Sequence, residues 1–199
     1  MLDQTITMLQ RSGFTAQLFH TAAEAKEAAL AIIPEDAAVG IGGSVTIQSM
    51  GLRESLMARG NAVHWHWYPQ GQDVNTVRKA AGDAPYYLTS ANAITKEGDL
   101  IAIDGFGNRV TAMLSPFNTV ILIVGRNKLT NDPLDAVKRI KSVACPQNAR
   151  RLNLKTPCAT GTCTDCRSPQ RMCNATIRIT NPPAGKGFYV FLVDEDLGY

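Results

Sequence analysis

The sequence predicts an α/β protein built as three layers, α/β/α, around a mostly parallel sheet. Segments with strand character alternate with segments with helix character along most of the 199 residues, a pattern typical of parallel strands joined by crossover helices. Residues 119–124, TVILIV, form one continuous apolar run of the kind found in a buried central strand. The length fits a single domain over residues 1–199, which includes a cysteine-rich segment at residues 156–175.

Composition and charge restrict the class of protein. The chain is 45% apolar and 19% charged, which is ordinary for a soluble globular protein, and no apolar run is long enough to cross a bilayer. The opening residues, MLDQTITMLQRSG, lack the positive charge and apolar stretch of an export signal. A net charge of +3, from 20 basic and 17 acidic residues, is too small to indicate nucleic-acid binding. We expect a cytoplasmic protein that binds neither nucleic acid nor a membrane, while the formation of a homo-oligomer stays open.

The first elements are expected to be a helix, a strand and a second helix. An apolar stripe at helical spacing ends before Gly13, which suits a left-handed helix cap. Residues 14–19, FTAQLF, alternate as a strand does. Thr21 and Glu24 form a capping box that opens an alanine-rich helix, and this helix must end by Pro34.

The next segment repeats this alternation. The run AAVGIGG reads as a short strand that enters glycines, and residues 44–59 follow as a helix that Gly51 breaks or bends. Residues 62–68, AVHWHWY, are rich in strand formers. A further helix is expected from Asp73 to near Gly82.

The second half begins with two strand-like runs, YYLTSANAIT and DLIAIDGFGNRV, on either side of the turn signal Glu97-Gly98. They predict a hairpin or a pair of neighbouring strands. After the central strand, Asp132 and Pro133 predict the start of a helix. The cysteine-rich segment is expected to be a loop, and ATIRIT and FYVFLV supply the last two strands.

The glycine-rich turn after the first apolar run is the strongest local motif. A strand that ends in glycines and feeds a helix presents unpaired backbone N–H groups to an anion, such as a phosphate or a carboxylate. The motif is not a Rossmann fingerprint, a P-loop or a complete nucleophile elbow. The alternative is a tight turn with a serine N-cap and no ligand. The candidate binding residues are Gly40, Gly42, Gly43, Ser44 and Thr46.

A second polar group brackets the strand DLIAID. Asn92, Asp104, Asn108 and Arg109 are candidates to converge on a ligand, with the arginine as an anion clamp, and Lys128 is a further candidate after the central strand. The alternative is a glycine turn stabilised by Asx caps.

Two smaller patterns are open to either interpretation. Glu97 is the weak candidate for a catalytic residue, paired with Asp99 as acid and base, although two acids beside a glycine turn are more often solvated. His64 and His66 share one face of a strand and could bind a metal, or they could belong to an edge strand or a pocket wall.

Four of the five cysteines follow the spacing C-x4-C-x2-C-x6-C: Cys158, Cys163, Cys166 and Cys173. The first two gaps match the plant-type ferredoxin pattern and the last does not. Zinc sites usually show two paired CxxC knuckles, and only one is present here. The odd number, with Cys145, fits disulfides poorly in a reducing compartment. The sequence therefore predicts an iron–sulfur cluster or zinc at these four residues, with free or reversibly oxidised thiols as the alternative.

The chain resembles the LUD family, the lactate utilisation domain family, in its cysteine-bearing subgroup. The resemblance rests on GIGGSVTIQSMGL, SANAITKEGDLIAIDGFGNRV, VILIVGRNKLTNDPLDAVKRI, TGTCTDCRSPQRMCN and FLVDEDLGY, from about residue 38 onward. It implies a fold similar to the NagB/RpiA/CoA-transferase group, whose members bind sugar phosphates or coenzyme A esters at loops like residues 40–46. It also implies a place in bacterial systems that oxidise lactate to pyruvate alongside iron–sulfur proteins.

Two functions are therefore expected. The first is binding or conversion of a small anionic metabolite, a carboxylate, a phosphate or a CoA thioester, at the glycine-rich turn. The alternative is an iron–sulfur electron-transfer module that uses the four cysteines and works with iron–sulfur redox partner proteins in a lactate-oxidation complex.

Overall fold

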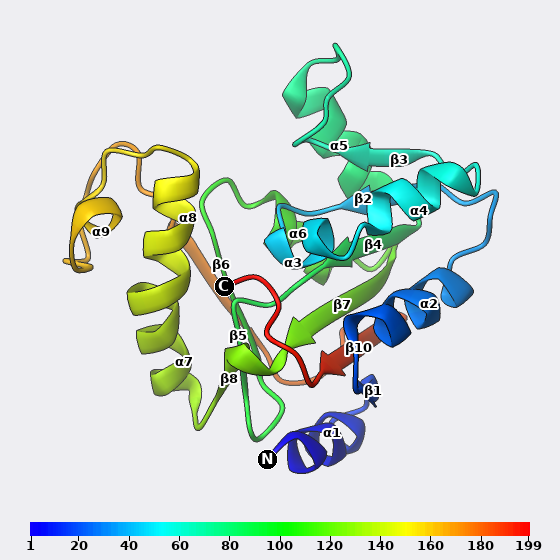
Figure 1. Cartoon of the computed structure of the whole chain (residues 1–199), viewed down its shortest axis with the longest axis horizontal. Helices are drawn as coiled ribbons and strands as arrows, with labels where there is room; N and C mark the ends of the chain where they lie inside the picture. Colours follow the sequence, from blue (N-terminus) through cyan, green and yellow to red (C-terminus); the bar gives the residue numbers. More distant parts are fainter.

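Ten strands form two sheets in the structure, a computed structural model that covers residues 1–199. The larger sheet has six strands, all parallel (Figure 1). Its order is β1 (Thr15–Phe19), β10 (Phe188–Val193), β7 (Thr119–Gly125), β4 (Tyr86–Thr89), β2 (Val39–Ile41) and β3 (Val63–Trp65). The predicted α/β fold with a mostly parallel sheet is confirmed.

Helices cover both faces of the six-stranded sheet, and β7 shows how the two cores divide. Val120, Leu122 and Val124 point into one core, whereas Ile121 and Ile123 point into the other, as alternate residues of a strand must. The first core includes α1 (Leu2–Arg11), α5 (Val74–Asp83) and α6 (Asn108–Leu114). The second includes α2 (Ala22–Ile32), α3 (Val45–Ser49) and α4 (Leu52–Ala58).

A second sheet of four strands was not predicted. Its order is β8 (Leu129–Thr130), β5 (Ala93–Thr95), β6 (Leu100–Asp104) and β9 (Ala175–Ile179). The predicted pair around the Glu97-Gly98 turn is confirmed as the antiparallel strands β5 and β6. The run YYLTSANAIT is not one strand, because the chain leaves the large sheet after β4 and enters the small sheet as β5.

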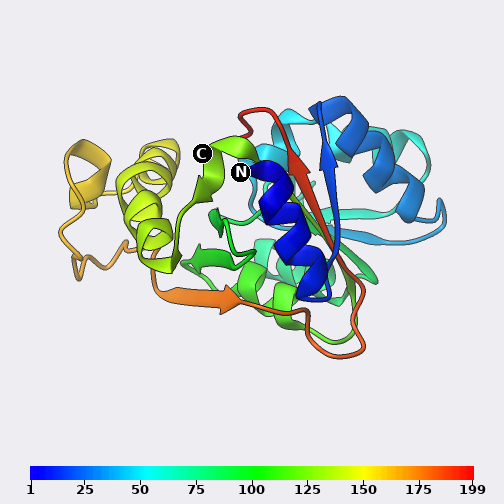
Figure 2. The same ribbon diagram turned by 90° about the horizontal axis from the view of Figure 1, so that it is seen from below.

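One long helical run packs against the small sheet. It consists of α7 (Pro133–Arg139), the π-helical turn η2 (Ile140–Ala144) and α8 (Cys145–Arg151). Asp132 caps its start as predicted, accepting from the backbone N–H groups of Leu134 and Asp135. The short helix α9 (Pro157–Thr160) and the rest of the cysteine-rich segment follow, and both views place them at one end of the molecule (Figures 1 and 2).

Local predictions were confirmed where short-range chemistry decides the structure. The capping box of Thr21 and Glu24 is complete, and Gly13 has φ +91°. Gly51, at φ +62°, splits the expected helix over residues 44–59 into α3 and α4. The segment after β6 was wrongly taken as strand, because α6 begins at Asn108. The 3₁₀ turn η1 (Arg126–Lys128) follows β7, and no helix has the length and apolar character needed to span a membrane.

Candidate functional site

A pocket of about 80 Å³ lies at the carboxyl ends of three neighbouring parallel strands. This is where open α/β sheets place their ligands. The loop after β2 supplies Gly43 to Thr46, the loop after β4 supplies Ser90 to Asn92, and η1 after β7 supplies Lys128. The wall opposite these loops comes from α8 and the segments that pack on it: Cys145, Asn148, Met172 and Tyr199.

Lys128 is the most unusual residue of the pocket. Its side chain is buried, with 3% of the residue exposed, and Nζ donates to Thr46 Oγ1 at 2.8 Å and to Ser90 Oγ at 2.9 Å. It forms no ion pair with any carboxylate. Burial, followed by the positive charges of Arg139 and Arg109, lowers the pKa of the Lys128 ammonium group from 10.5 to about 7.

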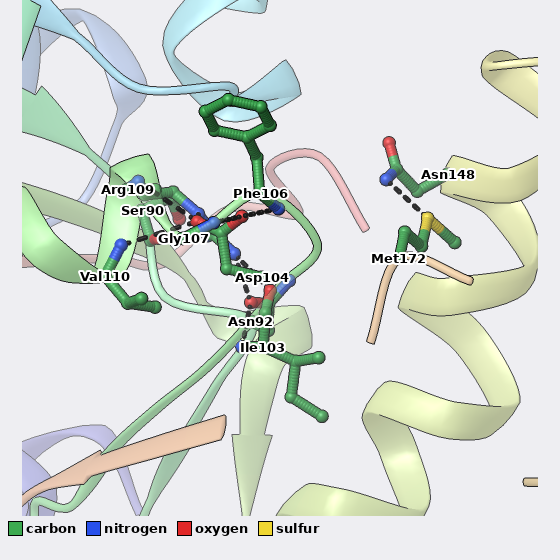
Figure 3. A network of polar contacts seen from close by, with 10 residues as sticks. All are labelled: Ser90, Asn92, Ile103, Asp104, Phe106, Gly107, Arg109, Val110, Asn148 and Met172. Carbon is green, nitrogen blue, oxygen red and sulfur yellow. Dashed lines mark hydrogen bonds and ion pairs between the residues drawn. The ribbon is translucent and has the colours of Figure 1, made fainter. Parts of the chain in front are cut away.

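Arg109 is held in place by bonds within the protein (Figure 3). Its guanidinium donates to Ser90 O at 3.0 Å, to Ile103 O at 2.6 Å and to Asn92 Oδ1 at 2.7 Å. Nε lies 3.8 Å from Asp104 Oδ2. Most N–H donors of Arg109, the predicted anion clamp, are therefore already used within the protein. Arg109 contributes positive charge to the pocket but few free N–H groups.

Asp104 shapes the loop between β6 and α6. Its carboxylate accepts from the backbone N–H groups of Phe106 and Gly107 at 3.1 Å and of Arg109 at 3.0 Å. This is the Asx-capped glycine turn that the sequence offered as the alternative. Asn92 has a similar role, since its Oδ1 also accepts from Ile103 N at 2.9 Å.

The predicted glycines divide into two groups. Gly43 lines the pocket with Ser44 and Thr46. Gly40 and Gly42 do not line it; a Cβ on Gly40 would lie 1.9 Å from the carbonyl oxygen of Ala81 in α5. Ser44 is the N-cap of α3, accepting from Ile47 N at 3.2 Å. Because α3 has only five residues, its dipole adds little to anion binding.

Glu97, His64 and His66 do not line the pocket. Glu97 is exposed on the turn between β5 and β6 and lines neither the pocket nor the cleft beside it. His66 and Asn108 line that neighbouring cleft. His64 lies in β3, which ends at Trp65, so His66 falls in the turn after the strand and not on one strand face with His64 as expected.

The neighbouring cleft, which we call the outer cleft, has a volume of about 470 Å³ and was not found from the sequence. Arginine and aromatic side chains from four separate regions line it, among them Trp67, Arg78, Phe106, Arg151 and Arg171. No spacing in the sequence connects them, because the β3–α5 segment, the β6–α6 loop, α8 and the segment before β9 meet only in the folded chain.

All five cysteines line one small cavity of about 20 Å³, together with Arg171, Met172, Thr156 and Thr164. All are free thiols, and Cys145, which the spacing had set apart, belongs to the same cavity. No three His, Cys, Asp or Glu side chains are arranged as a preformed metal site in the structure, so a metal at Cys158, Cys163, Cys166 and Cys173 stays a prediction. Burial, as the main cause, raises the pKa of the Cys145 thiol to about 12.

The fold and the pocket define an α/β protein with a site at the carboxyl ends of its parallel strands. The LUD domain family model matches residues 2–193, and the chain belongs to this family, which is associated with lactate utilisation. The 1.70 Å crystal structure of a DUF162 family protein from Deinococcus radiodurans is similar, with a TM-score of 0.53 and 13% identity over 96% of this chain and 95% of that chain. At this identity the likeness concerns the fold alone. No curated protein matches the chain.

Proposed function

We propose that the protein binds a small anionic metabolite, a carboxylate or a phosphate, in the pocket at the ends of β2, β4 and β7. The observation that carries this proposal is the buried ammonium group of Lys128, which has two hydroxyl partners and no carboxylate. The pocket volume of about 80 Å³ is several times the space that one water molecule needs, and it suits an anion of a few heavy atoms.

The electrostatic argument for a bound anion is that no negative charge accompanies the buried ammonium group of Lys128. Moving an ammonium group out of water is unfavourable by several kcal/mol unless an opposite charge accompanies it. The charges that act on Lys128 are instead the guanidinium groups of Arg139 and Arg109, which disfavour its charged form further. A bound anion would supply the absent partner and restore the charged lysine.

The hydrogen-bonding arrangement also leaves room for a ligand. Lysine has three N–H donors, and only two are used here. The hydroxyls of Thr46 and Ser90 donate to Leu197 O and Ala91 O, so each presents only acceptor lone pairs to Lys128. The third N–H of Lys128 is therefore left for an acceptor that the protein does not provide.

Titration calorimetry with sulfate, phosphate, lactate and pyruvate tests the proposal. The wild-type protein is expected to bind at least one of these anions, and Lys128→Met to weaken that binding at least tenfold because the counter-charge is lost. Lys138→Met is the matched control, since the Lys138 side chain is 66% exposed on α7. Equal affinity in the wild type and Lys128→Met would reject the proposal.

A second candidate function is that of an iron–sulfur redox module. The observation that favours it is the shared cavity of the five thiols, whose lining includes the guanidinium of Arg171. Arg171 donates to Cys166 O at 2.7 Å and to Cys173 O at 3.1 Å and forms no ion pair, which suits a site that carries thiolate charge. Cys158, Cys163, Cys166 and Cys173 would hold the cluster, which supplies one-electron chemistry when bound.

Anaerobic purification with iron, sulfide and zinc analysis tests this second function. Equal amounts of iron and acid-labile sulfide, lost in Cys163→Ser, would support it. Cys145→Ser is the matched control, expected to retain iron because a cluster takes four thiolates and this fifth one lies on α8. Zinc alone would make the segment a structural site, and absence of any metal would reject the redox function.

A further inference from the structure

The outer cleft continues directly from the pocket at the ends of β2, β4 and β7, which we call the anion pocket. The two share several residues in their walls, among them Gly43, Trp67, Arg109 and Met172. The outer cleft is the larger, at about 470 Å³ against about 80 Å³, and lies in the size range of sites for whole organic ligands. A ligand whose anionic end reaches Lys128 therefore has space to extend outward.

Positive charge dominates the walls of the outer cleft. Four guanidinium groups line it, and three of them, on Arg78, Arg151 and Arg171, form no ion pair. The single carboxylate is that of Asp104, which already accepts from three backbone N–H groups of its own loop at 3.0 to 3.1 Å. Such a concentration of arginines without carboxylate partners suits a group with more than one negative charge, such as a diphosphate.

Flat surfaces lie beside these charges. Phe106 is 65% exposed, and its ring protrudes from the β6–α6 loop (Figure 3). Arg78 lies over the Phe106 ring at 4.1 Å from its centroid, and Arg151 lies over the Trp67 ring at 4.3 Å. An exposed ring next to a stacked guanidinium offers a platform for a planar aromatic ligand.

Two buried polar atoms in the same cleft have no partner. Nε of Arg78 and Nδ1 of His66 are buried and form no hydrogen bond. Buried polar groups are usually satisfied, so unpaired ones in a cleft indicate a place where a ligand or water completes the bonding. Both atoms belong to the β3–α5 side of the outer cleft.

We propose that the outer cleft binds an adenosine diphosphate group, with the diphosphate on the arginines and the base stacked at Phe106. This inference rests on the proposed function, because it takes the group at Lys128 as the anionic end of the same ligand. The shared chemistry is that of ADP, coenzyme A and NAD, and the structure assigns the common moiety to the outer cleft rather than to the anion pocket. An ester or carboxylate joined to this moiety would lie toward Lys128.

Titration calorimetry of the full chain with ADP, coenzyme A, NAD⁺, adenosine and inorganic diphosphate tests the inference. ADP should bind at least tenfold more tightly than adenosine or diphosphate, because it engages both the arginines and the ring. Arg78→Met and Arg151→Met should each weaken ADP binding about tenfold, which is the usual effect of one charge-assisted contact. Phe106→Ala should weaken ADP binding and leave diphosphate binding unchanged. The relative affinities of coenzyme A and NAD⁺ distinguish the two sources of the moiety.

The control is Arg53→Met, which removes a guanidinium stacked 4.5 Å from the ring centroid of Tyr68, outside the cleft. It should leave ADP binding unchanged. Diphosphate binding as tight as that of ADP would overturn the assignment of a base, and absence of ADP binding would overturn the inference as a whole. The proposed function fails separately, because it requires small anions to depend on Lys128, and that dependence is measured without any nucleotide.

Discussion

Lys128 should give the protein a stability that rises with pH above neutrality. Its pKa is about 7 in the folded chain and 10.5 as a free side chain, so between these values the unfolded chain holds the extra proton. The free energy of unfolding should then increase by about 1.4 kcal/mol per pH unit in this window relative to Lys128→Met. Urea unfolding of the wild type and of Lys128→Met at pH 7 and pH 9 measures the difference in their free energies of unfolding. The contributions of the other titrating groups cancel in this difference. A difference that stays constant with pH would show that Lys128 titrates normally.

The residue scale also shows what the sequence could not specify. Lys128 was a candidate only because it follows the central strand. Its partners Thr46 and Ser90 are 82 and 38 residues away along the chain, so no local pattern reveals that it is buried between them. Asp104 and Arg109 were expected to contact a ligand, yet Asp104 accepts from its own loop and Arg109 donates to Ser90 O, Asn92 Oδ1 and Ile103 O. Polar residues after a strand look the same in sequence whether they bind a ligand or cap a turn.

At the scale of elements, the contact between β2 and α5 depends on Gly40. A Cβ there would meet the carbonyl oxygen of Ala81 at 1.9 Å, so Gly40→Ala should lower the free energy of unfolding by about 1–3 kcal/mol or more. Gly82→Ala is the matched control, because nothing lies within 4 Å of its added Cβ inside α5. That change should stabilise the protein by up to about 1 kcal/mol. Urea unfolding compares the three proteins, and equal stability of the two variants would contradict the close contact.

The glycines at the end of β2 indicated a close approach to the backbone, but at two of them the approaching group is part of the protein and not a ligand. A glycine in such a turn indicates that something approaches the backbone closely. At Gly40 the approaching group is α5, and at Gly42 it is the cluster of Tyr87, Thr89 and Arg109 side chains. Elements that depend on neighbouring residues, such as the capped α2 and α7, were predicted well. The β4–β5 division was not, because pairing with strands distant in sequence decides which sheet each half joins.

At the scale of the whole molecule, the pocket lies between two packing units. The large sheet contributes the loops after β2, β4 and β7, whereas the long helical run on the small sheet contributes the opposite wall. Residues 194–199 connect these units: Thr46 donates to Leu197 O, and the Tyr199 hydroxyl lies 2.7 Å from Asn148 Oδ1 on α8. The sequence predicted the strands of both units except β8, but it did not predict the contacts of residues 194–199, since their partners are about 50 to 150 residues away.

The side chain of Asn127 holds residues 194–199, the segment that connects the two units, so removing it should loosen this segment. Its Nδ2 donates to Gly198 O and its Oδ1 accepts from Leu197 N, both at 3.1 Å. At about 1 kcal/mol for each of the two hydrogen bonds, Asn127→Ala should weaken sulfate binding by up to about thirtyfold and speed hydrogen exchange in residues 196–199. Asn131→Ala is the matched control, since Asn131 is exposed and bonds only to Asp135. Faster exchange with unchanged sulfate affinity would show that the anion pocket is complete without this segment, so that Lys128 and the strand-end loops alone define it.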